Sequence, residues 1–182
     1  MAEQITVTLP DGSEMEVAKG TTSLQVAVNI GPNLAKDAVA AKVDGDVTDL
    51  TRPLEEDVTL SILTFDDPEG KDVYWHSTAH IMADAVMRLF PDARPTIGPA
   101  VEDGFYYDFE VDEPFSEEDL ENIEQEMQKI IDADYGFTCE TMPAGESAEY
   151  WEERGNIYKV ELASDIVAGL GKPVGTLPTI ID

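Results

Sequence analysis

The sequence is poor in cysteine, histidine and basic residues. Its one cysteine, Cys139, excludes an internal disulfide framework and a zinc module built on several cysteines. Lysine and arginine number 11 against 39 aspartates and glutamates in 182 residues, and the formal charge is −28. Because such a charge repels a phosphate backbone, this chain alone is not expected to hold nucleic acid at ordinary salt.

Long apolar runs are missing as well. No run approaches the roughly 18 residues of a membrane span, and the N-terminus lacks the basic-then-apolar pattern of a signal peptide. A cytoplasmic protein with no membrane partner is therefore expected. The apolar content of 42% excludes a wholly disordered acidic tail, and the length allows one or two domains with real cores.

Residues 1–64 predict a small sheet folded over one helix. Apolar and polar residues alternate at first, and an Asp-Gly pair then indicates a hairpin turn. The expected elements are strands over 5–9 and 15–17 around Asp11-Gly12, a helix capped at 21–23 and ended by Gly31-Pro32, and strands over 38–43 and 58–63. With no histidine, cysteine or glycine-rich phosphate loop, this segment is typical of a packing or docking module.

Both histidines of the chain lie in one predicted amphipathic helix over residues 72–89. His76 and His80 are four residues apart (HSTAH), which puts their Cβ atoms on one face, roughly 5–6 Å apart. Such a pair can bind a metal, orient a water or hold a substrate carbonyl or hydroxyl, and a packing role stays open. A zinc site lacks an evident third ligand, since Cys139 stands in a predicted strand. No glutamate separates the histidines, so the metalloprotease helix is excluded.

The remaining elements alternate between strands and helices. They are two short strands within 95–110 around a turn at 102–104, an acidic helix over 116–133, a strand over 137–141, a helix over 146–154 and a strand over 157–162. Phe105, Tyr107 and Phe109 are expected on one face of the first pair, as core or as part of a ligand site. Lys159, in the last strand, could face solvent or point into a cleft toward an anionic group.

Two stretches of sequence resemble known domains. ITVTLPDGSEMEV through VTLSILT is similar to a TGS domain, and HSTAH, PDARPTIGPAVEDGFYYDFE and ERGNIYKVEL then follow the editing region of the threonyl-tRNA synthetase family in order. The alanyl-tRNA synthetase editing module shares the two-histidine spacing but not the preceding TGS-like segment. The resemblance covers roughly residues 4–166. It implies an α+β chain with a β-grasp TGS domain over 1–64 and an α/β editing-type domain over 65–182 that is incomplete at its C-terminus.

The resemblance also implies a chemistry. A site that accepts threonine admits serine, because one methyl supplies only about 1–3 kcal/mol of discrimination, and a second site then hydrolyses the mischarged ester. By position, His76 and His80 match the editing histidines that organise the water, and Lys159 matches the lysine that contacts the substrate. Gly98 and Tyr107 fall where the family lines the pocket. The family site is not described as metal-dependent, so no metal is expected.

The sequence departs from the family after the YKV segment. Residues 1–182 contain no Asp-x-Cys-x-x-x-His motif and no class II catalytic core. We therefore expect an N-terminal fragment or truncated form that cannot make Thr-tRNA, with half an editing site. It has no cofactor of its own, because ATP, Mg and Zn would belong to the absent core. The expected partner is the 3′ end of tRNA(Thr) in the full-length enzyme, with any homodimer formed through absent regions. The alternative is a non-catalytic TGS-containing binding or regulatory module.

The charge has a second interpretation beside this resemblance. Residues 65–182 carry 7 basic and 28 acidic residues, a net charge of −21. Either the basic tRNA-binding surfaces belong to other regions, or the protein works in molar salt, where the Debye length is about 3 Å and repulsion is screened. A halophile-like surface predicts that stability rises with KCl.

Overall fold

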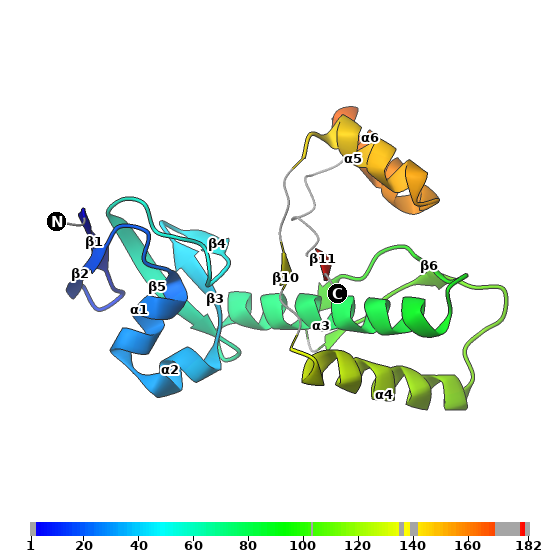
Figure 1. Cartoon of the computed structure of the whole chain (residues 1–182), viewed down its shortest axis with the longest axis horizontal. Coiled ribbons are helices and arrows are strands. Elements are labelled where there is room, and N and C mark those ends of the chain that lie inside the picture. Colours follow the sequence, from blue (N-terminus) through cyan, green and yellow to red (C-terminus); the bar gives the residue numbers. More distant parts are fainter. Residues whose placement is uncertain (1–2, 103, 135–136, 139–141, 170–178, 181–182) are drawn as a thin grey trace. The chain divides into compact units, whose positions relative to one another are not determined.

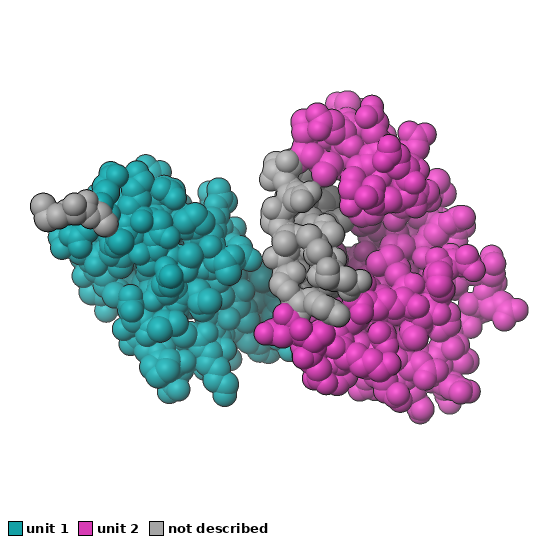
Figure 2. All heavy atoms as spheres, in the orientation of Figure 1, with its two compact units in different colours: residues 1–75 teal, residues 76–182 magenta. Residues whose placement is uncertain are grey.

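The computed structural model of the chain describes residues 3–102, 104–134, 137–138, 142–169 and 179–180. It divides into two compact units, residues 1–75 and 76–182 (Figure 2). Both contain helices and strands, which confirms the predicted α+β class. The predicted division into domains after residue 64 stays a prediction.

Unit 1 is built on a five-stranded sheet with strand order β2-β1-β5-β3-β4 (Figure 1). Strands β1 (Gln4–Thr8) and β2 (Glu14–Ala18) form the expected antiparallel hairpin, and Gly12 takes a left-handed φ of 82° in its turn. The other strands are β3 (Ala38–Val43), β4 (Asp46–Thr48) and β5 (Val58–Thr64). The central β5 runs parallel to β1 and antiparallel to β3.

One main helix lies against this sheet, as predicted. Helix α1 (Ser23–Ile30) begins with a capping box: Thr22 Oγ1 accepts from the Gln25 backbone N–H, and the Gln25 side chain accepts from the Thr22 N–H. Gly31 ends α1, and Pro32 then opens a further short helix, α2 (Pro32–Asp37). The buried core joins α1 to the strands through Ile5, Val7, Val17, Val26, Ala41, Leu54, Val58 and Leu60.

Helix α3 (Pro68–Leu89) carries both histidines. It begins four residues before the predicted residue 72, at a proline whose fixed φ suits the first turn of a helix. The acidic helix α4 (Glu117–Asp132) is confirmed, with Ser116 as its N-cap. In unit 2 the two helices share a core of Ala85, Val86, Ala93, Ile123 and Ile130.

Between α3 and α4 the chain forms two small antiparallel ladders. β6 (Arg94–Pro95) pairs with β9 (Phe109–Glu110), and β7 (Ala100–Val101) pairs with β8 (Gly104–Phe105). This agrees with the predicted pair of strands around a turn. Tyr107 and Phe109 are half-buried, whereas Tyr106 is 45% exposed, so the alternation of faces is confirmed.

The last described elements are β10 (Phe137–Thr138), which pairs with β11 (Thr179–Ile180), and two helices, α5 (Ala144–Glu153) and α6 (Ile157–Val167). Cys139 lies outside the described residues. The predicted strand over 157–162 is wrong: this segment is the first half of α6. The Asn156 side chain caps a helix there, and the buried positions 156, 159 and 163 follow the helical repeat.

No helix in the described part of the chain is long and apolar enough to cross a membrane.

Candidate functional site

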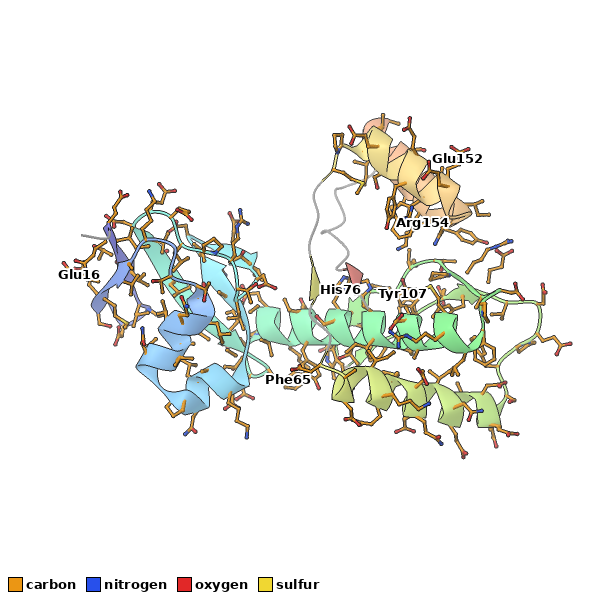
Figure 3. The ribbon with its side chains drawn as sticks, viewed as in Figure 1. Glu16, Phe65, His76, Tyr107, Glu152 and Arg154 are labelled. Atoms are coloured by element: carbon orange, nitrogen blue, oxygen red, sulfur yellow. The ribbon has the colours of Figure 1, made fainter. Side chains whose placement is uncertain are left out.

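The two histidines meet on the unit 2 part of α3, where Figure 3 labels His76. Their Nε2 atoms are 3.1 Å apart, and the ring planes cross at 84° with centroids 4.6 Å apart. One ring nitrogen can therefore donate a hydrogen bond to the other only when at least one imidazole is neutral. The spacing of four residues produces this contact because side chains at i and i+4 lie one turn apart on a helix.

Lys159 is buried in the first turn of α6, with only 7% of its surface exposed. Its backbone N–H donates to the side chain of Asn156 at 3.1 Å, and Asn156 is itself buried. Among the residues that the structure describes, no carboxylate lies within ion-pair distance of the Lys159 ammonium group. Burying an ammonium group is costly, so Lys159 marks a position of functional interest.

The three side chains are electrostatically linked. Burial is the main cause that lowers the pKa of His76, and the charge of Lys159 adds to it. Burial, then His76, then Lys159 lower the pKa of His80 to about 4. Burial also lowers the pKa of Lys159. These shifts favour the uncharged form of both imidazoles at neutral pH, and the Lys159 charge acts on both in the same direction.

A metal site needs more donors than this pair supplies. Within the described ranges, no group of three or more histidine, cysteine, aspartate or glutamate side chains is placed to hold a metal ion. The third zinc ligand considered from the sequence, Cys139, falls outside those ranges.

Gly98 and Tyr107 contact each other. A Cβ added at Gly98 would overlap the Tyr107 ring, so only glycine leaves room for the ring at this place. The ring stacks on Phe109 at a centroid distance of 5.0 Å and an angle of 26°. Burial raises the pKa of the Tyr107 hydroxyl, which stays protonated at neutral pH.

A cleft of about 760 Å³ lies elsewhere in unit 2, between the β6–β9 ladder and the turn from α5 to α6. Its lining includes Arg94, Glu110, Trp151, Arg154 and Asn156. Arg94 and Glu110 form an ion pair across the ladder at 3.2 Å, and the Arg154 guanidinium lies 3.5 Å over the Tyr150 ring. Burial first, and then the charge of Glu110, raise the pKa of the Tyr158 hydroxyl.

The structure thus gathers the predicted residues in two groups. The first group is His76, His80 and Lys159, and the second is Gly98 with Tyr107. Among the described contacts, no hydrogen bond or ring contact joins the two groups. Sequence reasoning missed Asn156, whose side chain accepts from the Lys159 N–H. The available signal was Asn156 itself, a preferred helix cap that follows Gly155.

Known proteins are similar to this chain over both units. Residues 5–64 match the TGS domain family. The threonine–tRNA ligase of Acetivibrio thermocellus is 53% identical over 165 residues, which are 91% of this chain and 26% of the relative. The corresponding ligase of Desulforamulus reducens is 52% identical over 89% of this chain and 26% of its own length. The ligase of Hyphomonas neptunium is 48% identical over 90% of this chain and 25% of its own length.

The chain therefore spans about a quarter of the length of these relatives. It carries a TGS domain and, over some 90% of its residues, is similar to the N-terminal region of threonine–tRNA ligases.

Proposed function

We propose that this chain is the N-terminal part of a threonyl-tRNA synthetase and that its second unit hydrolyses serine esters on tRNA(Thr). The observation that carries the proposal is the 3.1 Å contact between the His76 and His80 imidazoles, together with the buried side chain of Lys159, whose charge lowers the pKa of both rings. The likeness to threonine–tRNA ligases supports the substrate class. The ligation of threonine in the longer protein, and its cytoplasmic location, belong to the same proposal.

Ester hydrolysis requires a positioned water, a proton acceptor and a partner for developing negative charge. A water oxygen attacks the ester carbonyl carbon, its proton passes to an imidazole nitrogen, and the carbon–oxygen bond to the ribose breaks. The ribose oxygen then takes up a proton. Two neutral imidazoles can hold the water and accept its proton, and the ammonium of Lys159 can face the carbonyl oxygen.

The two histidines are suited to different tasks. A group with a pKa of about 4, as at His80, is a poor proton acceptor at neutral pH but a stable hydrogen-bond partner. His76 is less strongly shifted and is the better acceptor of the proton. We assign the orienting of water to His80 and the proton transfer to His76.

The binding of tRNA must overcome the charge of the chain. Unit 2 offers no excess of basic residues, since residues 76–182 carry 6 basic and 24 acidic residues, a net charge of −18. We therefore assign the binding of the tRNA body to other regions of the longer protein. This site would bind only the aminoacylated 3′ end. No cofactor takes part in the proposed hydrolysis.

A deacylation assay tests the proposal. Purified chain is mixed with Ser-tRNA(Thr) or Thr-tRNA(Thr) at several salt concentrations, and loss of each ester is followed. Selective loss of the serine ester, abolished in the His76→Ala, His80→Ala double variant, is expected. The role of Lys159 is tested with the variant Lys159→Met. Its control is Lys129→Met, which removes a lysine on the surface of α4.

The outcomes separate the alternatives. Equal hydrolysis of both esters would remove the claim of selectivity. No hydrolysis at any salt, both by this chain and by the full-length protein, would overturn the proposed activity. A pull-down interaction that is lost without residues 1–64 and unaffected by His76→Ala would then favour a TGS-containing binding module.

A further inference from the structure

The cleft of about 760 Å³ in unit 2 takes no part in the hydrolysis proposed above, since neither histidine nor Lys159 lines it. Its volume is usual for a small-ligand site, for which about 300–1,000 Å³ is typical. Three segments far apart in the sequence form its walls: the end of α3 with residues 91–95, the end of β9 with residues 111–112, and the turn between α5 and α6. The cleft is therefore a product of the fold of unit 2.

The wall contributed by α5 is aromatic. Trp151 is half-buried there and makes an edge contact with Tyr150, with ring centroids 5.1 Å apart and planes at 87°. An indole ring held in a wall offers a flat apolar surface, on which a planar ring such as a nucleobase can stack.

Asn156 adds a polar group to the same wall. Its side chain is buried, with 9% of the residue exposed, and its Oδ1 accepts from the Lys159 N–H at 3.1 Å. That bond fixes which amide atom is the oxygen. The amide nitrogen makes no hydrogen bond to any residue that the structure describes. Because a buried donor needs an acceptor, this nitrogen is suited to bind one supplied by a ligand.

The charges of the lining are mixed, with a small acidic excess. They are Asp92, Arg94, Glu110, Asp112 and Arg154. Arg94 is paired with Glu110 at 3.2 Å. Arg154, labelled in Figure 3, donates from Nη1 to the Tyr150 carbonyl at 3.1 Å, and its guanidinium lies 3.5 Å over the Tyr150 ring. The cleft therefore suits a planar ring with its own donors and acceptors better than it suits a polyanion.

Helix α3 connects this cleft to the histidines. Met87 lines the cleft and follows His80 by seven residues, which is about 10 Å along the helix axis. Nucleotides in a stacked strand follow one another at about 3.4 Å. When the terminal nucleotide of an RNA strand lies at the histidines, the few nucleotides before it are therefore within reach of the cleft.

We propose that the cleft binds one of the two unpaired cytidines that precede the terminal adenosine of tRNA. Trp151 stacks on the cytosine ring, the Asn156 amide donates to a ring acceptor, and Asp92 or Asp112 accepts from the N4 amino group. Uracil has a carbonyl in place of that amino group and fits these carboxylates poorly. The proposal rests on the proposed function, in which the terminal adenosine carries the serine ester to the histidines.

NMR titration of the intact chain with the ribonucleotide CCA tests the binding. The chain has two tryptophans, so the indole resonance of Trp151 reports on the cleft and that of Trp75 on unit 1. We expect only the Trp151 resonance to move, with a Kd on the order of 1 mM. The ribonucleotide UUA should bind roughly tenfold more weakly, because its edges lack the amino group.

Two variants test the residues named. Asn156→Asp keeps an oxygen to cap α6 but replaces the amide donor, and it should weaken CCA binding roughly tenfold. Asn122→Asp, which adds the same charge at an exposed position of α4, is its control. Trp151→Leu should weaken binding roughly fivefold or more, measured at the amide resonance of Gly155, which also lines the cleft.

The outcomes distinguish this proposal from the proposed function. If CCA moves neither the Trp151 nor the Gly155 resonance, or if folded Asn156→Asp binds CCA as Asn122→Asp does, the cleft is not the binding site. Equal affinity for CCA and UUA would overturn the recognition of cytosine. If CCA binds as expected but neither this chain nor the full-length protein hydrolyses the serine ester, the cleft proposal stands and the proposed function fails.

Discussion

The Nε2 atoms of His76 and His80 lie 3.1 Å apart on one face of α3. This contact requires that the two rings are not both protonated, because two imidazolium rings present only donors to each other. The nearby Lys159 charge and the burial of the rings act in the same direction, since both disfavour the charged form. At physiological pH the two uncharged imidazoles can therefore act as hydrogen-bond partners for a polar group.

Removing the charge of Lys159 should raise the pKa of both histidines. The ammonium group contributes to lowering each of them, after burial at His76 and after burial and His76 at His80. Lys159→Met keeps the apolar stem without the charge, and Lys129→Met is the matched surface control. NMR titration of the imidazoles measures the change. Identical titration curves for wild type and Lys159→Met would place the ammonium group too far away to act.

The stability of the folded chain should depend on pH through His80. The pKa is about 4 when folded and about 6.5 when unfolded, so the unfolded chain binds the extra proton between these values. The contribution of His80 is fully present above pH 6.5 and is lost as pH falls toward 4. We expect the stability of wild type relative to His80→Gln to drop by about 2 kcal/mol over that window, allowing for partial exposure of the ring. Urea unfolding at each pH measures it, and a constant difference would contradict it.

Gly98→Ala should disturb the ring of Tyr107. The added Cβ would overlap that ring, and overpacking of this kind costs about 1–3 kcal/mol. The ring would also leave its stack on Phe109, which near-ultraviolet circular dichroism and urea unfolding can report. Gly145→Ala is the control: nothing lies within 4 Å of its added Cβ, and stability should be unchanged or slightly raised. Equal stabilities for the two variants would refute the close contact.

Ser116→Ala should destabilise α4. The Ser116 hydroxyl accepts from the Asp119 N–H, and the Asp119 carboxylate accepts from the Ser116 N–H in return, which forms a capping box. Loss of such a cap costs about 1 kcal/mol in urea unfolding. Ser164→Ala, which removes only a hydroxyl donating to the Val160 carbonyl within α6, should change stability by less than about 0.5 kcal/mol. Equal losses for the two variants would argue against the cap.

Potassium chloride should stabilise the chain. The charge of −28 is spread over 182 residues with few cations to offset it, so self-repulsion opposes the compact state. Thermal unfolding between about 0.1 and 2 M KCl should show a rising midpoint, since the Debye length falls from about 10 Å toward 3 Å or less. A midpoint that does not change over this range would end the halophile-like interpretation.

Much of the local structure follows from the sequence. The turn at Asp11-Gly12, the cap at Ser116 and the pairing of His76 with His80 depend on residues within a few positions of one another. Such features have their physical cause in the chain itself: a left-handed φ that glycine tolerates, a side-chain oxygen that satisfies a free N–H, and a repeat of 3.6 residues per turn.

The tertiary structure decided the rest. Residues 157–162, expected as a strand, form a helix whose buried positions 156, 159 and 163 follow the helical repeat, and which side of that helix is buried depends on packing. The burial of Lys159 near histidines some 80 residues earlier, and the close contact of Tyr107 with Gly98, depend on where the chain returns in space. Residue type and spacing fix which groups are available, whereas desolvation and distance, which set their pKa values, arise only from packing.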